Sequence, residues 1–495
     1  MKVALVICPQ SNPDKPPLAL AYLGAYLRER NIEVACFDFN IDLYSRTNNE
    51  KKNLWNSVMD VAWTEKHRYD LINLVDDVVI QGWVEQIEQA APQIIGFSLL
   101  STNMLSTLKL ARKLRERSNK VKIIFGGPEV YKVYGCAYQQ IFSCADALVF
   151  GEGEESLFQI ISSIMNSGRI EPRSGIMVKK CDVFLGSDTP TLIGDVDNIN
   201  FPAYDWFPLN KYKEKGAQLP LIFSRGCIGK CNFCFERAYW RKFRCRSVNN
   251  VIAEIKQIRE KYGVWCFALN DSLINGNMQF LSEFCDRVID EDIKISWWGM
   301  ARINSQMTEQ FLAKMVKAGC VQLAYGIESG SQKVLDAMRK GYDIHIIDQV
   351  LRNTYQVGIK LGVSLMLGFP GEEEDDFQLT CELVKRNGQY LSYTNISTLG
   401  IEPFTDIFNE RIRKRINIKN IFNWLTDMSI FNLNIRSFTN LYKDRIKKDI
   451  DFKNCINWQT LDRRNNPLTR TDRARRLSKV VNQYVGKAIT FTSKA

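Results

Sequence analysis

The sequence predicts an α/β protein in which two regions of alternating strands and helices precede a mainly helical C-terminal region. Apolar segments of strand length recur, separated by segments with helical periodicity, and strand signals stop beyond about residue 405. A chain of 495 residues also has room for about three domains. We therefore expect domains at 1–165, 216–404 and 405–495, with a connector at 166–215.

In the first region, five apolar segments alternate with helical ones. The expected strands are Val3–Cys8, Glu33–Phe39, Gln93–Leu100, Val121–Phe125 and Ala147–Phe150, and helices are expected at Leu18–Arg30, within 50–90 and at Met104–Arg117. Strands separated by helices predict a doubly wound, Rossmann-like parallel sheet. Ligands bind at the carboxyl ends of such strands, where the loops Ser98–Asn103, Gly126–Glu129 and Gly151–Glu154 lie. Glycine permits close backbone approach to a ligand, but for a glycine pair seen alone a tight turn is the favoured interpretation.

The second region contains six expected strands. They are Leu219–Ser224, Trp265–Leu269, Ile295–Met300, Val321–Gly326, Lys360–Leu367 and Ser392–Leu399, with helices such as Val248–Tyr262 and Thr308–Ala318 between them. Six units are too few for a closed eight-unit barrel and predict an open, partial (β/α)6 barrel. In the connector, Ile176–Leu185 is expected to form a small hairpin.

The composition is that of a globular protein, with 45% hydrophobic and 24% charged residues, which excludes a largely disordered or fibrous chain. No apolar run approaches the roughly 18 residues of a membrane helix, and Val3–Cys8 is too short for a signal-peptide core. We therefore expect a cytoplasmic protein whose 14 cysteines are thiols or metal ligands.

The net charge of +11 is concentrated at the C-terminal end. Residues 411–495 contain 20 Lys and Arg against 6 Asp and Glu, whereas the first 410 residues contain 46 and 49. This basic tail is interpreted either as a solvated helical surface or as a docking surface for an anionic partner.

Three cysteines lie close together after the first strand of the second region. Cys227, Cys231 and Cys234 have the spacing C-x3-C-x2-C, which lets one loop present three thiolates to an iron–sulfur cluster. Three ligands for four irons leave one iron open, as a catalytic metal site requires. Zinc is the alternative, but Cys245 is eleven residues away and the only histidines are His67 and His345.

This cysteine loop resembles that of the radical S-adenosylmethionine (SAM) enzymes, and in particular their cobalamin-associated branch. The resemblance extends in order through Ser224–Ser247, Asn270–Ser272, Ala301–Asn304, Gly326–Ser331 and Leu367–Glu372. It implies that the open iron binds the amino and carboxylate groups of SAM. It also implies that Glu328 hydrogen-bonds the SAM ribose or amino group, beside Gly326 in the same motif, and that Phe233 flanks the adenine. Arg302 and Asp271 would face the same site, and a surface ion pair is the alternative interpretation of Glu328.

The first region resembles the cobalamin-binding domain that precedes radical SAM domains. The residues that carry this resemblance are Pro16–Leu23, Gly96–Ser98, Gly126–Pro128 and Gly151–Glu154. It implies that one loop approaches the lower corrin face with Ser98, Leu100, Ser101 and Asn103, and that two glycine loops line the nucleotide tail with Gly126, Gly127, Gly151, Glu152, Gly153 and Glu154. The Asp-x-His-x-x-Gly motif of many cobalamin modules is absent, and His67 is interpreted as a surface histidine. The cobalt would then lack a histidine ligand; alternatively, the domain has lost cobalamin and helps to bind substrate.

The combined resemblance implies a 4Fe–4S enzyme that reductively cleaves SAM to methionine and a 5′-deoxyadenosyl radical. The expected activity is methylation of an unactivated carbon in a peptide, natural-product or lipid substrate, possessing an anionic group if the basic tail docks it. An electron donor such as flavodoxin or ferredoxin is expected as partner, and nucleic acid is not. No protein group is assigned as a catalytic base or nucleophile.

Two other enzyme classes remain open. One is a radical SAM cyclase or rearrangement enzyme that uses cobalamin without net methylation. The other is a tRNA methylthiotransferase, which would need a second cluster on three N-terminal cysteines, a spacing that Cys8, Cys36, Cys136 and Cys144 lack. A non-enzyme in which the tail binds RNA would show steeply salt-dependent binding.

Overall fold

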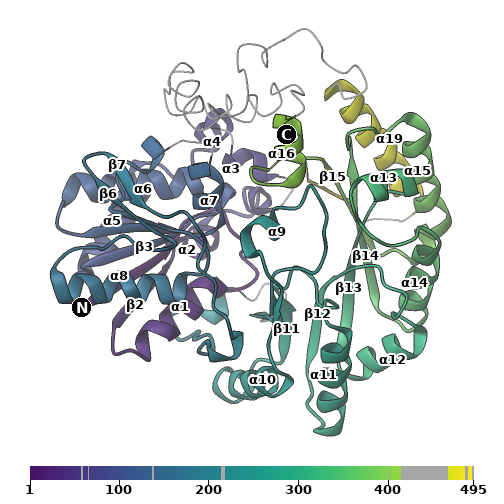
Figure 1. Cartoon of the computed structure of the whole chain (residues 1–495), viewed down its shortest axis with the longest axis horizontal. Coiled ribbons are helices and arrows are strands. Elements are labelled where there is room, and N and C mark those ends of the chain that lie inside the picture. The colour runs from purple at the N-terminus through teal and green to yellow at the C-terminus, as the bar shows by residue number, and fades with distance from the viewer. Residues whose placement is uncertain are drawn as a thin grey trace. The chain divides into compact units, whose positions relative to one another are not determined.

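The computed structural model describes two compact units, each built on a sheet of seven strands. It describes the whole chain except residues 57–58, 65, 136–138, 213–217, 401, 414–466, 485–488 and 493–495. The first unit contains the described residues before Gln218, and the second contains those from Gln218 onward (Figure 1).

The first sheet has the strand order β2-β1-β3-β4-β5-β6-β7. The strands are β1 (Lys2–Ile7), β2 (Glu33–Asp38), β3 (Ile94–Ser98), β4 (Lys122–Gly126), β5 (Ala147–Val149), β6 (Ile176–Lys180) and β7 (Val183–Gly186). The first five are parallel, as predicted, and β6 and β7 form the predicted antiparallel hairpin at the edge. The strand order reverses between β1 and β3, which is where doubly wound sheets bind ligands.

Helices cover both faces of this sheet. They are α1 (Leu18–Arg28), α2 (Phe39–Arg46), α3 (Asp60–Thr64), α4 (Lys66–Ile72), α5 (Asp77–Gln89), α6 (Met104–Arg117), α7 (Pro128–Gly135) and α8 (Gly153–Ser167). Figure 1 shows α1 beside α8 and α5 beside α6, and these helices pack in the same pairs. The helix α6 has the predicted bounds because a leucine-rich stripe is buried along it and Arg115 and Arg117 occupy its last turn, where cations are favourable.

The segment predicted as a connector packs onto the first unit. A Cβ atom at Gly24 in α1 would lie 2.6 Å from the Trp206 ring, so only glycine lets that indole rest on the helix. Asp205 is 3.1 Å from Arg28, and the Tyr212 hydroxyl donates to Asp38 at 2.6 Å. Residues 199–212 therefore belong structurally with α1 and β2.

The second sheet is parallel throughout, in the order β16-β15-β14-β13-β12-β11-β8. Its strands are β8 (Gln218–Leu221), β11 (Cys266–Leu269), β12 (Ser296–Ala301), β13 (Cys320–Glu328), β14 (Lys360–Leu367), β15 (Tyr393–Thr398) and β16 (Ile489–Thr492). The six predicted strands are confirmed. The prediction that strands stop beyond residue 405 is wrong, because β16 pairs with β15 at the edge. Its Ile-Thr-Phe-Thr sequence suits a strand, but four residues near a chain end give a weak signal.

The second unit contains a small ribbon of β9 (Ser224–Arg225) and β10 (Arg244–Cys245) and several helices. These are α9 (Phe235–Trp240), α10 (Val248–Tyr262), α11 (Met278–Asp290), α12 (Glu309–Lys317), α13 (Gln332–Ala337), α14 (His345–Gln356), α15 (Glu374–Asn387), α16 (Asp406–Arg413) and α19 (Pro467–Tyr484). Of the predicted helical C-terminal region, α16 and α19 are helices and residues 414–466 lie outside the described part. Among the described helices, none has the length and apolarity to span a bilayer.

Candidate functional site

The three cysteines lie on one loop that begins at β9 and ends at α9 in the second unit. The turn before Cys227 requires glycine, because Gly226 has φ +91° and a Cβ atom there would lie 2.3 Å from the Lys242 carbonyl oxygen. At the other end, Cys234 is the N-cap residue of α9. The turn thus fixes where the cysteine loop, Cys227–Cys234, leaves the sheet.

Buried polar groups anchor the base of this loop. The Asp271 carboxylate accepts from the backbone N–H groups of Phe223 at 2.9 Å and Ser224 at 2.6 Å, and from the Ser224 hydroxyl at 2.6 Å. Burial raises the pKa of Asp271 to about 6. Beside it, buried Arg246 pairs with buried Glu254 at 2.6 Å. Asp271 therefore holds the strand below the cysteines, and its contact with SAM stays a prediction.

The thiols of Cys227 and Cys231 lie next to Gly229. A Cβ atom at this glycine would lie 3.2 Å from Cys227 Sγ and 3.8 Å from Cys231 Sγ, and the Gly229 N–H donates to Cys227 Sγ at 3.2 Å. Burial, with smaller contributions from the charges of Glu236, Cys231 and Cys227, raises the pKa of Cys234 to about 12. Three thiolates so close together need a positively charged group between them.

The donor set fits an iron–sulfur cluster better than a single metal ion. Among the described residues, no three His, Cys, Asp or Glu side chains converge on one metal-ion position. A 4Fe–4S cluster binds each cysteine through a different iron, so its ligands need not converge on one point. Cys227, Cys231 and Cys234 would hold three of the irons and leave the fourth for another ligand.

A buried ion pair forms a second part of the site. Glu328 is the last residue of β13, has φ +74°, and lies 3.3 Å from Lys340 Nζ. The two side chains are only 12% and 8% exposed, so the predicted alternative of a surface pair does not describe this contact. A Cβ atom at Gly326 would lie 2.9 Å from Glu328 Oε1, so this glycine leaves space for the carboxylate.

Arg302 joins the cysteine loop to this ion pair. It follows β12, and its Nη1 would lie 3.4 Å from a Cβ atom at Gly229, while its Nη2 would lie 3.1 Å from one at Gly341, next to Lys340. Its positive charge also lowers the pKa of the Cys227 thiol, although burial is the larger effect and raises it. The structure thus brings together the cysteine loop, Arg302 and Glu328, as the sequence predicted.

The segment after α13 was not predicted to be part of the site. Asn232, between the cysteines, donates from its backbone N–H to Met338 O at 3.1 Å and from its side chain to Ala337 O at 2.8 Å. Lys340 follows, and the Tyr342 hydroxyl donates to Ile327 O at 2.9 Å. No signal in the sequence indicated this segment, because nothing in a lysine or tyrosine indicates which distant strand end it reaches.

Phe233 packs beneath the cysteine loop. Its ring centroid is 6.5 Å from that of Phe369, at an interplanar angle of 77°. The ring lies against a buried group consisting of Val334, Met338, Phe369, Leu399 and Ile407, together with partly buried Met366. Phe233 therefore connects the cysteine loop to three other elements, and its contact with adenine stays a prediction.

In the first unit, the loop after β3 is tied to its own backbone. Buried Asn103 accepts from the Leu100 N–H at 2.9 Å and donates to Ser98 O at 3.0 Å. Ser101 is exposed, whereas Ser98 and Leu100 are half-buried. Asn103 thus shapes the loop, and Ser101 is the most accessible of the predicted corrin contacts.

The glycine loops of the first unit are also packed against the chain itself. A Cβ atom at Gly127 would lie 2.6 Å from Leu99 O, and one at Gly151 would lie 2.4 Å from Thr191 O. Both residues have positive φ, +99° and +89°. These glycines are required by the fold, and their predicted contacts with cobalamin stay predictions.

The remaining predicted cobalamin residues have internal contacts of the same kind. Gly126 ends β4 and accepts from the Leu99 N–H at 2.8 Å, and Gly153 begins α8 with Leu23 3.1 Å from its Cβ position. The buried Glu152 carboxylate accepts from the Ile193 N–H, and Glu154 is buried in the first turn of α8. The side chain of His67 lies outside the described part of the structure.

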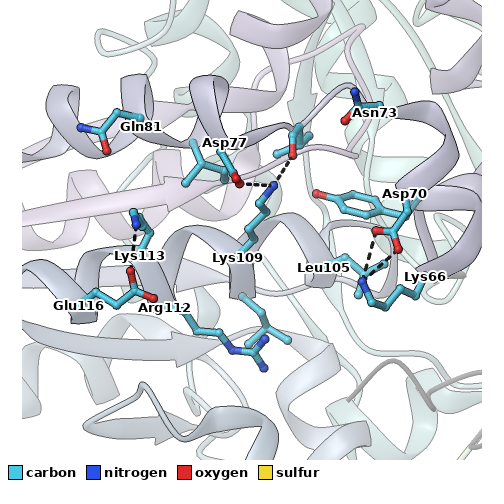
Figure 2. A pocket seen from close by; sticks show the side chains of 14 residues that line it. Lys66, Asp70, Asn73, Asp77, Gln81, Leu105, Lys109, Arg112, Lys113 and Glu116 are labelled. Carbon is cyan, nitrogen blue, oxygen red and sulfur yellow. Dashed lines mark hydrogen bonds and ion pairs between the residues drawn. The ribbon is translucent and has the colours of Figure 1, made fainter. Parts of the chain in front are cut away.

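A pocket of about 740 Å³ lies in the first unit between α4, α5 and α6 (Figure 2). Two lysine–carboxylate pairs line it: Lys109 of α6 with Asp77 of α5 at 2.9 Å, and Lys66 with Asp70 within α4 at 3.1 Å. None of the predicted cobalamin contacts lines this pocket. It is formed by helices and not by the loops at the strand ends.

Comparison with known families assigns both units. Residues 221–384 match the Radical SAM superfamily, and residues 56–161 match the B12 binding domain. The chain therefore contains a B12 binding domain followed by a radical SAM domain, the two domains of cobalamin-dependent radical SAM enzymes. The first match includes the cysteine loop and Glu328, and the second includes the loops after β3, β4 and β5.

Three curated relatives have different activities. An uncharacterized methyltransferase of Pyrococcus horikoshii is 25% identical over 433 residues, 86% of this chain and 85% of the relative. The cytidylyl-2-hydroxyethylphosphonate methyltransferase of Streptomyces wedmorensis is 24% identical over 447 residues, 80% of this chain and 78% of the relative. An anaerobic magnesium-protoporphyrin IX monomethyl ester cyclase of Synechocystis is 26% identical over 302 residues, 59% of this chain and 60% of the relative.

Two solved structures share the fold. The radical SAM methyltransferase TsrM of Kitasatospora setae, solved with cobalamin and a 4Fe–4S cluster, has a TM-score of 0.64 at 15% identity, covering 84% of this chain and 75% of that one. The cobalamin-dependent radical SAM enzyme OxsB has a TM-score of 0.59 at 17% identity, covering 83% of this chain and 55% of that one. The similarity therefore extends over both units of this radical SAM enzyme.

Proposed function

We propose that this chain is a cobalamin-dependent methyltransferase that binds a 4Fe–4S cluster through Cys227, Cys231 and Cys234 and acts on an unactivated carbon. The observation that carries the proposal is the cysteine loop and its charged neighbours in the same chain as a B12 binding domain. Two relatives of similar length are methyltransferases. The substrate class is a peptide, a natural-product intermediate or a lipid.

The residues around the cysteine loop suit a zwitterionic ligand such as SAM. A reduced cluster would supply the electron that cleaves the SAM sulfonium to a 5′-deoxyadenosyl radical. Arg302 and Lys340 offer two cations for the SAM carboxylate, and Glu328 offers an acceptor for the ribose or the ammonium group. Phe233 and Gly326 would bound the adenosyl part, while Asp271 holds the strand below.

Cobalamin would carry the methyl group, bound at the carboxyl edge of the first sheet near Ser101. The chain has only two histidines; His67 lies in α4, and His345 begins α14 of the other unit. Neither follows a strand of the first sheet, which supports cobalt without a protein histidine ligand. The contacts proposed for the corrin and its tail are those of Ser98, Asn103, Gly126, Gly127, Gly151, Glu152 and Gly153.

An external one-electron donor of the flavodoxin or ferredoxin kind would reduce the cluster. Lys230, Arg241 and Lys242 are exposed on the cysteine loop and on the turn that packs against Gly226. Such cations suit an acidic carrier protein. All twelve cysteines in the described ranges are free, which supports a reducing, cytoplasmic setting.

A cyclisation or rearrangement without net methylation is the second candidate. It is favoured by the similarity of 59% of the chain to a magnesium-protoporphyrin cyclase. Both candidates share SAM cleavage, so they differ only in whether the SAM methyl group enters the product.

An isotope experiment separates the two candidates. Extracts of a strain that lacks this protein are incubated anaerobically with the reconstituted enzyme, a reductant and SAM carrying a deuterated methyl group. The methyltransferase proposal expects a product that gains a labelled methyl group and is absent without enzyme. A new product without label would instead support the cyclase or rearrangement enzyme.

A further inference from the structure

The C-terminal helix α19 packs against the second unit close to the loop that follows β14. It lies beside α15 (Figure 1), and β16, which follows it, extends the same sheet. This helix belongs to the basic tail, and two of its cations, Arg473 and Arg476, pair with carboxylates of the barrel. Part of the tail's charge therefore serves the radical SAM unit itself.

Arg473 of α19 forms a buried ion pair with Glu372. Its Nη1 is 3.1 Å from Glu372 Oε2, and the two side chains are 8% and 0% exposed. The guanidinium also lies 5.6 Å from the centroid of the Phe377 ring. Among the described residues, Arg473 is the cation that pairs with this buried carboxylate, whose other oxygen, Oε1, has no hydrogen-bond partner there.

Glu372 in turn closes the turn Gly368–Glu372. Its Oε2 accepts from the Gly368 N–H at 2.7 Å, and its own N–H donates to Phe369 O at 3.0 Å. Gly368 and Gly371 have φ of +76° and +85°, so the turn uses backbone conformations that need glycine. The Glu372 carboxylate thus links the ends of a five-residue turn.

This turn carries Phe369 to the cysteine loop. Phe369 is buried in the apolar group beneath that loop, and its ring contacts Phe233, which immediately precedes Cys234. A continuous series of contacts therefore leads from Arg473 through Glu372 and Phe369 to the cysteine loop. It lies entirely within the second unit.

We propose that Arg473 is a positioning residue for SAM binding: docking of α19 holds the turn Gly368–Glu372, and through Phe369 and Phe233 it shapes the wall of the cluster site. This inference rests on the proposed function, which places SAM at that site. The chain supplies a control one turn along, since Arg476 pairs with Glu374 at 2.5 Å and both side chains are 42–49% exposed. Arg473 Nε lies 3.6 Å from the same Glu374, so Arg476→Met removes only the exposed partner of that carboxylate.

The test compares Arg473→Met with Arg476→Met in the full-length, anaerobically reconstituted enzyme. Iron and sulfide contents are measured first, and the SAM dissociation constant is then determined by titration. We expect Arg473→Met to raise this constant about tenfold, equivalent to about 1.4 kcal/mol. Arg476→Met should change it less than about twofold, because an exposed pair contributes little.

A double variant tests the route through Glu372. A glutamine at this position still accepts from the Gly368 N–H and needs no counter-ion, so Glu372→Gln combined with Arg473→Met should raise the SAM dissociation constant less than Arg473→Met alone. Arg473→Lys keeps the charge but loses the planar guanidinium, so an intermediate increase of about threefold is expected. This milder variant keeps the test decisive if Arg473→Met does not fold.

Two readouts distinguish positioning from general stability. Thermal unfolding is followed for each variant, and the electron paramagnetic resonance spectrum of the reduced cluster is recorded during SAM titration. The proposal expects the SAM-dependent spectral change to require about ten times more SAM in Arg473→Met. A lower melting temperature with an unchanged SAM dissociation constant would overturn it. If the wild-type protein with an intact cluster binds no SAM, both the proposed function and this inference fail. If the wild type binds SAM and every variant binds it with the same dissociation constant, only this inference is overturned.

Discussion

The two units differ in the kind of residue that lies at the ends of their strands. In the radical SAM unit, Cys227, Arg302 and Glu328 lie at or just after strand ends. Arg302 lies beside Cys227 at Gly229 and beside Gly341, which follows the lysine that pairs with Glu328. In the B12 unit, the predicted residues at strand ends, such as Asn103 and Gly127, are engaged by the unit's own backbone. Side chains with their own chemistry therefore indicate a site directly, whereas a glycine indicates only that something approaches the backbone.

The largest expected effect comes from the cysteine loop. Cys231→Ala removes one of three cluster ligands, so SAM cleavage should fall by at least about 10³-fold, together with the iron content. Formation of 5′-deoxyadenosine and iron content are measured on the same anaerobic preparation. Cys266→Ala, in β11, is the control and should retain both. Equal losses in the two variants would contradict the assignment of the cluster to this loop.

The buried ion pair below the cysteine loop, Arg246 with Glu254, should show the next largest effect. Arg246→Met leaves the buried Glu254 carboxylate without its cation, so the free energy of unfolding should fall by about 3–5 kcal/mol. Urea unfolding measures the change. Arg287→Met breaks an exposed pair with Glu291 and should cost less than about 1 kcal/mol. Similar costs for the two variants would mean that this buried pair does not anchor the site.

Two substitutions in the B12 unit test whether the residues that its fold needs differ from those that contact cobalamin. Gly127→Ala should destabilise the protein by about 2 kcal/mol with or without cobalamin, because its Cβ would clash with Leu99 O at positive φ. Ser101→Trp, at an exposed position, should leave stability unchanged and weaken hydroxocobalamin binding about tenfold. Stability is measured by urea unfolding, and binding by absorbance. If Ser101→Trp bound cobalamin normally, the loop after β3 would not approach the corrin.

Another expected effect is a pH dependence from Asp271. Burial raises its pKa to about 6 in the folded protein, against about 3.9 in an unfolded chain. The folded state thus binds this proton more tightly, so the stability that it contributes is complete below about pH 4 and is lost as the pH rises to about 6. The slope is at most about 1.4 kcal/mol per pH unit. In urea unfolding, the difference between wild type and Asp271→Asn should change over that range and be constant above about pH 7; a constant difference throughout would contradict the shift.

The elements that the sequence predicted well are those with a long periodic pattern. The bounds of α6 and α10 agree with the prediction, since each has a buried stripe and a defined end. The strand β16 was missed because its four residues give little pattern. The tail was also interpreted too simply, because the pairing of Arg473 with Glu372 depends on a contact between residues about a hundred positions apart.

The residues of the candidate site also divide into those that the sequence predicted and those that it did not. Cysteine spacing and motif order predicted Cys227, Arg302 and Glu328, because these residue types carry the chemistry themselves. Lys340 and Asn232 were not predicted, since their roles arise only when the segment after α13 folds against the cysteine loop. Local sequence contains no information about that approach.

The most direct test of the central claim is the amount of 5′-deoxyadenosine formed from SAM by the reconstituted chain under anaerobic, reducing conditions. We expect at least one equivalent per chain, dependent on both the reductant and the cluster. A preparation with a full complement of iron and sulfide that forms none would contradict the radical SAM assignment of the cysteine loop.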